Sequence, residues 1–253
     1  MFDDLKPHIA DLRKRLTLSV IVIIVFAFFA FYFHKIIIDF TKAPLVSMVG
    51  KDPFIGGIGV FFTAMKISLF TGFIMALPIV FWQIWLFVAP GLYDNEKKYI
   101  IPFVAVSTLM FLIGAFFAYW VVIPLGFEFL WMFAGNLVNF MQTLDEYMGI
   151  FIKLLFGFGV AFEMPVFLFF LGAIGLITDK SLKDFFSYAV VIIFVVAAVL
   201  TPPDVITQLL MAIPLVILYA ISILAVKMVN PYKEEEKTDE EISESKEISR
   251  IDD

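Results

Sequence analysis

Long apolar stretches separated by short polar ones dominate the pattern along this chain. A helix needs about 20 mostly apolar residues to cross the hydrocarbon core of a membrane. The stretches of this kind, bounded by charges or prolines, lie at 17–33, 62–88, 100–123, 150–176, 185–200 and 205–226. The pattern predicts an all-α membrane protein with six transmembrane helices, and an even number of spans places both termini on one side.

The segments outside these spans have different patterns. Leu5, Ile9, Leu12 and Leu16 follow one another at spacings that place them on one helical face, so residues 1–16 are expected to be an amphipathic cytoplasmic segment along the inner membrane surface. The 17–226 region is the expected transmembrane domain. Residues 227–253 are rich in acidic and poor in apolar residues, which predicts a disordered cytoplasmic tail.

Two details of the spans predict an uneven shape. The fifth span has 16 residues between Phe185 and Leu200, so it covers about 24 Å of a hydrocarbon core of about 30 Å and is expected to thin the bilayer locally. Pro78, Pro165 and Pro214 fall inside the second, fourth and sixth spans. Each removes a backbone hydrogen bond, so kinked helices that form a concave bundle are expected, with short spans five and six. Alternatively, these are tolerated membrane prolines without function.

Composition and charge support a membrane protein and orient it. Hydrophobic residues make up 62% of the 253 positions, compared with about 45–50% in soluble domains. Thirteen of the 18 Lys and Arg residues lie on the side of the termini, which predicts cytoplasmic termini in the inner membrane. The chain has no Cys, which excludes a disulfide framework and a thiolate zinc site.

Motifs of catalysis are missing from the sequence. The chain has two His residues and lacks H-E-x-x-H, G-x-S-x-G and P-loop motifs. It also lacks a basic patch that would bind nucleic acid. We therefore expect a protein that is not an enzyme, with no catalytic residues, no metal, no cofactor and no nucleic-acid partner, embedded in membrane lipid.

Glu163 is the most informative intramembrane residue, because it lies in the middle of the fourth span. A charged group at that depth costs about 2.5–3.5 kcal/mol on insertion scales, and such residues face protein or water or are protonated. One interpretation is a functional carboxyl group. The other is a neutral acid that is hydrogen-bonded to the carbonyl freed by Pro165.

Other polar residues allow two interpretations each. Asp204 is placed to cap the sixth span, although it is also a candidate intramembrane functional residue. Gln208, one turn later, either extends a polar strip into the membrane or bonds a neighbouring helix. Asp11 and Glu96 are, by spacing alone, solvated charges on the cytoplasmic side.

Several short stretches together carry a family resemblance. They are His8-Ile-Ala-Asp-Leu-Arg-Lys-Arg-Leu16, Ala43-Pro-Leu45, Gln83-Ile-Trp-Leu-Phe-Val-Ala-Pro-Gly-Leu92 with Glu96, Phe162-Glu-Met-Pro-Val166, and Thr201-Pro-Pro-Asp-Val205 through Gln208. In this order along six spans, they resemble the TatC family, the multi-spanning receptor subunit of the twin-arginine protein translocase. The resemblance runs from about Lys6 to Met228.

The resemblance implies a receptor for twin-arginine signal peptides of folded export cargo. It assigns recognition to Asp11 and Glu96, and Phe87 and Pro44 match positions in loop motifs of the family. A guanidinium fork binds a carboxylate through two parallel hydrogen bonds, whereas Lys offers a point charge, so arginine pairs are expected to be preferred.

The resemblance also implies roles within the membrane. Glu163 resembles the family's buried glutamate, while Thr201 and Gln208 resemble the site where a single-span TatA/TatB-type subunit docks. Self-association in a receptor complex and transport driven by the proton-motive force are implied as well. The alternative from another class is a proton-coupled secondary transporter that uses Glu163; an intramembrane enzyme is a third.

Overall fold

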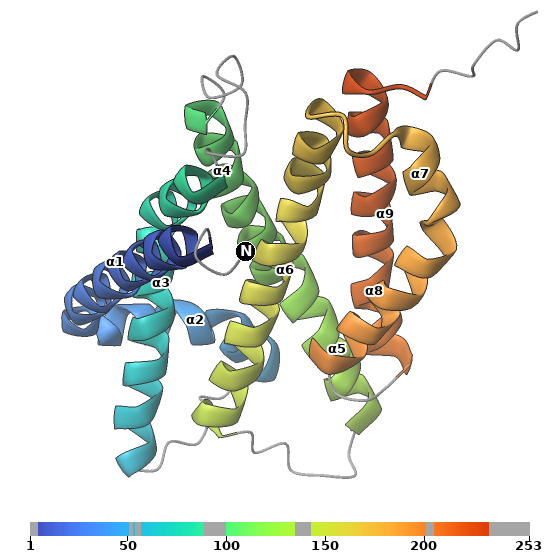
Figure 1. Ribbon diagram of the computed structural model, residues 1–253. Helices are drawn as coiled ribbons and strands as arrows, with labels where there is room; N and C mark the ends of the chain where they lie inside the picture. Colours follow the sequence, from blue (N-terminus) through green and yellow to red (C-terminus); the bar gives the residue numbers. More distant parts are fainter. Residues whose placement is uncertain are drawn as a thin grey trace, which may run out of the picture.

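The chain folds into long helices that run back and forth across the molecule (Figure 1). The computed structural model describes residues 5–50, 53, 57–88, 100–134, 143–200 and 205–232. Their helical elements are α1 (Leu5–Tyr32), α2 (His34–Val49), α3 (Gly57–Val88), α4 (Ile100–Phe117), the π-helical turn η3 (Ala118–Val122), α5 (Ile123–Ala134), α6 (Leu144–Ala173), α7 (Asp179–Asp184), α8 (Phe186–Leu200) and α9 (Val205–Val229). The predicted all-α class is confirmed.

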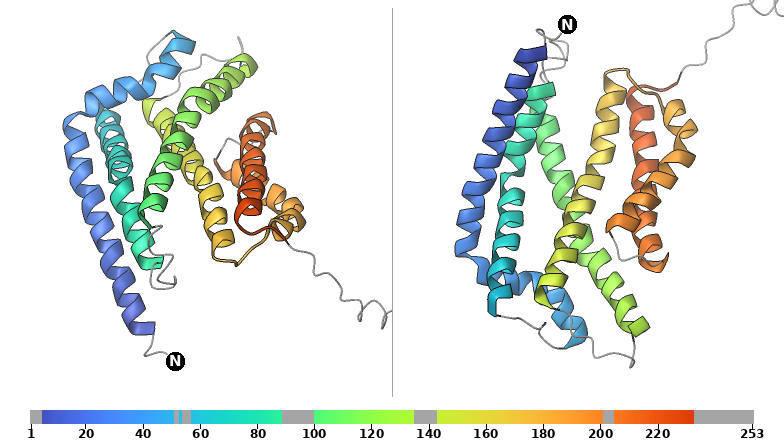
Figure 2. Two further views of the ribbon diagram at one scale, coloured as in Figure 1. Left: turned by 90° about the horizontal axis from the view of Figure 1, so that it is seen from above. Right: turned by 60° about the horizontal axis from the view of Figure 1, so that its bottom comes forward.

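Five helices are long and apolar enough to cross a membrane, counting α4, η3 and α5 as one, and α8 is a shorter apolar helix. The six-span arrangement is therefore confirmed. In the right-hand view of Figure 2, the start of α1 and the end of α9 lie at the same end of the molecule. We call this the terminal end, and the end that carries α2 the opposite end.

The fifth span is short, as predicted, whereas the sixth is longer than expected. Helix α8 has 15 residues, so it covers about 22 Å at 1.5 Å per residue and is too short for a typical hydrocarbon core. Helix α9 has 25 residues and ends at Val229, three residues beyond the expected end of the sixth span. The shortness is therefore confined to α8.

Helix α1 continues without a break through the segment that was expected to lie along the membrane surface. Ile9, Leu12 and Leu16 of the predicted apolar face are all exposed. However, the turn that would lay this segment flat is missing, because 28 consecutive residues of α1 are helical. The segment extends the first span towards the terminal end.

Helix α2 was not expected, and Pro44 lies inside it rather than in a loop. A proline at this position has no N–H to bond the carbonyl of Phe40, four residues earlier. The hydroxyl of Tyr119, in η3, donates to that carbonyl at 2.9 Å, and the Phe40 and Tyr119 rings stack with centroids 4.8 Å apart. The Tyr147 hydroxyl of α6 donates to the next carbonyl, that of Thr41, at 2.7 Å. Two tyrosines thus fix α2 to the bundle.

The third span continues beyond the predicted end at residue 123. The proline at 124 suggests a helix end. Instead, the helix has a wider π-helical turn, η3, just before this proline, in which Ile123 N–H bonds the carbonyl of Ala118. Such π-turns are inserted within helices and often mark functional positions. The span reaches Ala134 as α5.

Helix α6 begins six residues earlier than predicted, at Leu144, and contacts α3, α4, α8 and α9. Thr143 accepts a bond from Glu146 N–H, and Glu146 accepts one from Thr143 N–H, so a capping box starts the helix. Tyr147, Phe151 and Phe158 of α6 are almost fully buried in the core. Helix α6 is therefore the centre of the bundle.

The connection between α6 and α8 is fixed to the end of α9. Asp179, at the start of α7, accepts from Lys183 at 2.6 Å and from Tyr232 N–H at 2.8 Å. These hydrogen bonds, led by that of Lys183, lower the pKa of Asp179. The Asn230 side chain donates to the carbonyl of Ile177. The residues at the start of α7 and those just after α9 are thus joined by hydrogen bonds at the terminal end.

Candidate functional site

The seam between α1 and α3 sets the position of the first candidate site. Gly72 of α3 lies against Ala27 of α1 so closely that a Cβ added to the glycine would be 2.6 Å from the Cα of Ala27. The two helices are antiparallel. Asp11 lies sixteen residues before Ala27, and Val88 lies sixteen residues after Gly72, a rise of about 24 Å in each helix. The register therefore brings Asp11 to the level of the last turn of α3.

Asp11 lies on the side of α1 that is partly covered, and its carboxylate is paired. Its Oδ2 accepts a bond of 2.7 Å from Nε of Arg15, one turn later in the same helix. The Asp11 side chain is 38% exposed and that of Arg15 is 22% exposed. The carboxylate is therefore reachable from outside, although it has a guanidinium neighbour.

Phe87 stands in the last turn of α3, at the same level, rather than in a loop. It is 37% exposed. Two residues earlier, Trp85 is buried: its ring stacks on Phe103 with centroids 4.7 Å apart, and meets Phe170 edge-on at 4.7 Å. This aromatic cluster joins α3, α4 and α6, so it holds the end of α3 that presents Phe87.

Glu96, Thr201 and Asp204 lie outside the described residues. Glu96 follows Val88 by eight positions in the sequence. The structure thus brings Asp11 and Phe87 to one level at the terminal end, and the pairing of Asp11 with Glu96 stays a prediction. The capping role of Asp204 and the docking role of Thr201 also stay predictions.

Glu163 lies where α4 and α6 cross at close range. A Cβ on Gly114 of α4 would be 2.5 Å from the carbonyl oxygen of Phe158, so the helix backbones touch five residues before Glu163. The carboxyl group faces Ser107 and the backbone of Phe111, both on α4. Its Oε1 is buried and has no hydrogen-bond partner among the described residues. The group therefore faces α4, not the carbonyl freed by Pro165.

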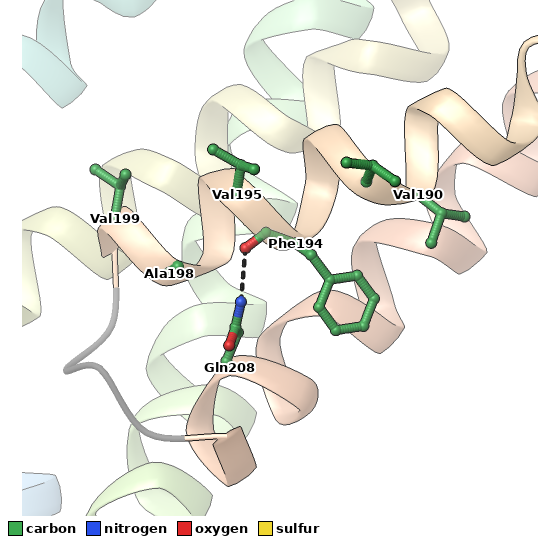
Figure 3. A pocket seen from close by; sticks show the side chains of 7 residues that line it. Val190, Phe194, Val195, Ala198, Val199 and Gln208 are labelled. Atoms are coloured by element: carbon green, nitrogen blue, oxygen red, sulfur yellow. Dashed lines mark hydrogen bonds between the residues drawn. The ribbon is translucent and has the colours of Figure 1, made fainter.

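Gln208 lines an apolar groove between α8 and α9 with a volume of about 490 Å³ (Figure 3). The other lining residues are Val190, Val191, Phe194, Val195, Ala198 and Val199. Nε2 of Gln208 donates to the carbonyl of Phe194 at 2.9 Å, so the side chain bonds a neighbouring helix, as one of its two interpretations had it. A carbonyl only accepts, so the amide nitrogen of Gln208 must face Phe194. The lining of the groove is thus apolar except for the side-chain amide of Gln208, near the start of α9.

Two residues of these sites were not singled out from the sequence. Arg15 contacts Asp11, and its spacing of four residues along a helix was the available signal. Trp85 supports the end of α3, but its neighbours Phe103 and Phe170 come from distant segments. Periodicity within one helix cannot reveal such contacts between helices.

Comparison with known sequences identifies the family. The family profile described as "Sec-independent protein translocase protein (TatC)" matches residues 7–214, which is most of the chain. The chain belongs to the TatC family. It is therefore a multi-pass membrane protein of a protein-translocase family, as the resemblance in sequence indicated.

Curated TatC proteins align with this chain over nearly its whole length. The Helicobacter pylori J99 protein is 48% identical over 95% of this chain and 96% of its own length. The Campylobacter jejuni protein is 48% identical over 95% of this chain and 100% of its own length. The Aquifex aeolicus protein is 40% identical over 91% and 98%, respectively. All three carry the name Sec-independent protein translocase protein TatC.

A solved structure of a TatC protein has the same fold. The crystal structure described as the twin arginine translocase receptor TatC superimposes with a TM-score of 0.79 and is 40% identical. The match covers 88% of this chain and 99% of that chain. At this identity and coverage, the helical arrangement described above is that of the TatC family.

Proposed function

We propose that this chain is the receptor subunit of a twin-arginine translocation system, which binds twin-arginine signal peptides of folded export cargo. The observation that carries the proposal is the match, at 40% identity over 88% of this chain, to a structure named as the twin arginine translocase receptor. The receptor recruits single-span subunits, and the proton-motive force drives transport.

The chemistry of the terminal end supports signal-peptide binding there. Asp11 is reachable and lies level with the exposed ring of Phe87. A guanidinium ligand can bond the carboxylate through parallel N–H groups and stack on an aromatic ring, whereas an ammonium group offers a point charge. Glu96 is proposed as the second carboxylate of this site, one for each arginine.

The α8–α9 groove is the proposed docking site of a single-span partner helix. An apolar helix fits the valine-rich lining, and a polar side chain on that helix would bond the side-chain amide of Gln208. The short α8 supports this role, because a locally thin bilayer favours association of helices. Thr201 and Asp204 are proposed to add polar groups next to Gln208. Glu163 is proposed as a functional carboxyl group deeper in the bundle.

The proposed location is the inner membrane with both termini in the cytoplasm. The excess of Lys and Arg on the side of the termini supports this orientation. It places Asp11 and Phe87 where cytoplasmic cargo arrives, and α2 on the outer side.

The test is binding of a twin-arginine signal peptide to the full chain in lipid nanodiscs. Asp11→Asn with Glu96→Gln should weaken binding at least tenfold, because two charge-assisted contacts are lost. A twin-lysine version of the peptide should bind the wild-type chain more weakly than the twin-arginine version.

A matched control is Asp39→Asn, which removes an exposed carboxylate at the opposite end, where Asp39 pairs with Lys42. This variant should bind the peptide as the wild-type chain does. Undiminished affinity in the Asp11 and Glu96 double variant would reject the assigned site.

A further inference from the structure

Arg15 touches the proposed binding carboxylate, yet the proposed function gives it no role. Its Nε lies 2.7 Å from Oδ2 of Asp11. The contact engages one of the two carboxylate oxygens and one of the five guanidinium donors. Before any ligand arrives, the carboxylate therefore already has a guanidinium partner from its own helix.

The two residues share one side of α1. Asp11, Arg15 and Ser19 are partly covered, and this row leads along the helix to Ala27, which packs on α3. Arg13 and Lys14, between them in sequence, are exposed. Of the three basic residues in this turn, Arg15 is the one that contacts Asp11. Its effect on a ligand at Asp11 is thus separable from general positive charge.

We propose that Arg15 is the resident counter-ion of Asp11, and that a signal-peptide arginine binds by displacing it. This inference rests on the proposed function. Binding then exchanges one guanidinium for another, so no additional ion pair is gained at Asp11. Affinity is consequently lower, and less sensitive to salt, than it would be for an unpaired carboxylate.

The strength of the internal pair sets the size of the effect. A partly exposed acid–base pair within one helix turn is weak, so a ligand with two parallel hydrogen bonds can replace it. Competition from such a pair lowers the affinity for a cationic ligand by about two- to threefold. Arg15 therefore adjusts the affinity of the site without abolishing it.

The experiment measures the dissociation constant of a twin-arginine signal peptide for the full chain in nanodiscs, at low and high salt. Arg15→Gln should tighten binding about two- to threefold at low salt and make binding more sensitive to salt. Lys14→Gln is the matched control, because it removes the same charge from the same turn without touching Asp11; its gain should be clearly smaller. Arg15→Lys, which keeps a competing charge, should fall between wild type and Arg15→Gln.

The same measurement in an Asp11→Asn background separates displacement from other effects, since Arg15→Gln should bring no gain there. Weaker or unchanged binding in Arg15→Gln, or an equal gain in Lys14→Gln, would overturn the inference while leaving the proposed function intact. If Asp11→Asn binds as well as wild type, the inference and the role of Asp11 in the assigned site both fail. If the wild-type chain fails to bind the peptide, the proposed function fails as well.

Discussion

At the scale of single residues, Pro44 and Tyr119 illustrate how a missing donor in one helix is replaced from another. Pro44 leaves the Phe40 carbonyl without its helical partner, and the Tyr119 hydroxyl supplies a bond of 2.9 Å. The two residues are 75 positions apart in the sequence. Their roles are therefore coupled, although they do not form a hydrogen bond with each other.

This coupling is measurable as a double-mutant cycle on thermal or denaturant unfolding. Tyr119→Phe alone should cost about 1 kcal/mol, because it leaves the part-buried carbonyl of Phe40 without a partner. In a Pro44→Ala background the helix regains its own N–H donor, so the same substitution should cost clearly less.

Tyr147→Phe provides the comparison. Its hydroxyl bonds the carbonyl of Thr41, whose helical partner Leu45 keeps its N–H. The cost of Tyr147→Phe should therefore be unaffected by Pro44→Ala. Equal costs for Tyr119→Phe in both backgrounds would disprove the coupling.

The sequence indicated many of the polar residues that matter but few of their partners. Gln208 allowed two interpretations, and its bond to Phe194 agrees with the one that has it contact a neighbouring helix. For Glu163, however, the neighbours Ser107 and Phe111 lie on a helix more than fifty residues away. Such contacts depend on how helices cross, which periodicity along one helix does not encode.

At the scale of helices, glycines determine how closely neighbouring backbones approach. Gly72 lies against the backbone of Ala27, and Gly114 lies against that of Phe158. Close approach through small residues is a common means of helix packing in membranes, where apolar contact with lipid competes with apolar contact between helices. These two glycines therefore fix α1 to α3 and α4 to α6.

Gly72→Ala should destabilise the chain by about 1–3 kcal/mol, since the new methyl group must displace backbone of α1 rather than a flexible side chain. The measurement is the thermal unfolding midpoint of the purified chain. Gly59→Ala, in the same helix, has open space around the added methyl group. It should be neutral or stabilising, and an equal loss in both variants would contradict the packing argument.

The positions of the spans could be predicted from apolar runs, whereas several helix ends could not. The third span continues past Pro124, which follows the π-helical turn η3. Helix α6 starts at a capping box, Thr143 with Glu146, which lies before the apolar run. Helix α2 was missed because it does not span and contains a proline. Local hydrogen bonding decides these ends more than hydropathy does.

At the scale of the whole molecule, the alternating direction of the helices predicts which surfaces are accessible from each side. Ser47 on α2 and Asp184 at the end of α7 are both exposed, and these two helices lie at opposite ends of the molecule (Figures 1 and 2). The chain has no Cys of its own, so single cysteines can be labelled without background.

With cytoplasmic termini, Ser47→Cys should react with a membrane-impermeant maleimide in intact spheroplasts, and Asp184→Cys only after the cells are broken. The two variants serve as controls for each other. The reverse pattern would invert the orientation, and equal labelling of both would argue against the span count.

The α1–α3 contact limits where residues can be inserted into these two helices. Asp11 and Phe87 are level because Asp11 lies sixteen residues before Ala27 and Phe87 lies fifteen residues after Gly72, the two residues at which the helices touch. One residue inserted between Asp11 and Ala27 would rotate Asp11 about 100° around α1 and raise it by about 1.5 Å. A carboxylate on the seam would then point into lipid or solvent, so insertions in this half of α1 should be tolerated only in whole turns, matched by equal insertions in α3.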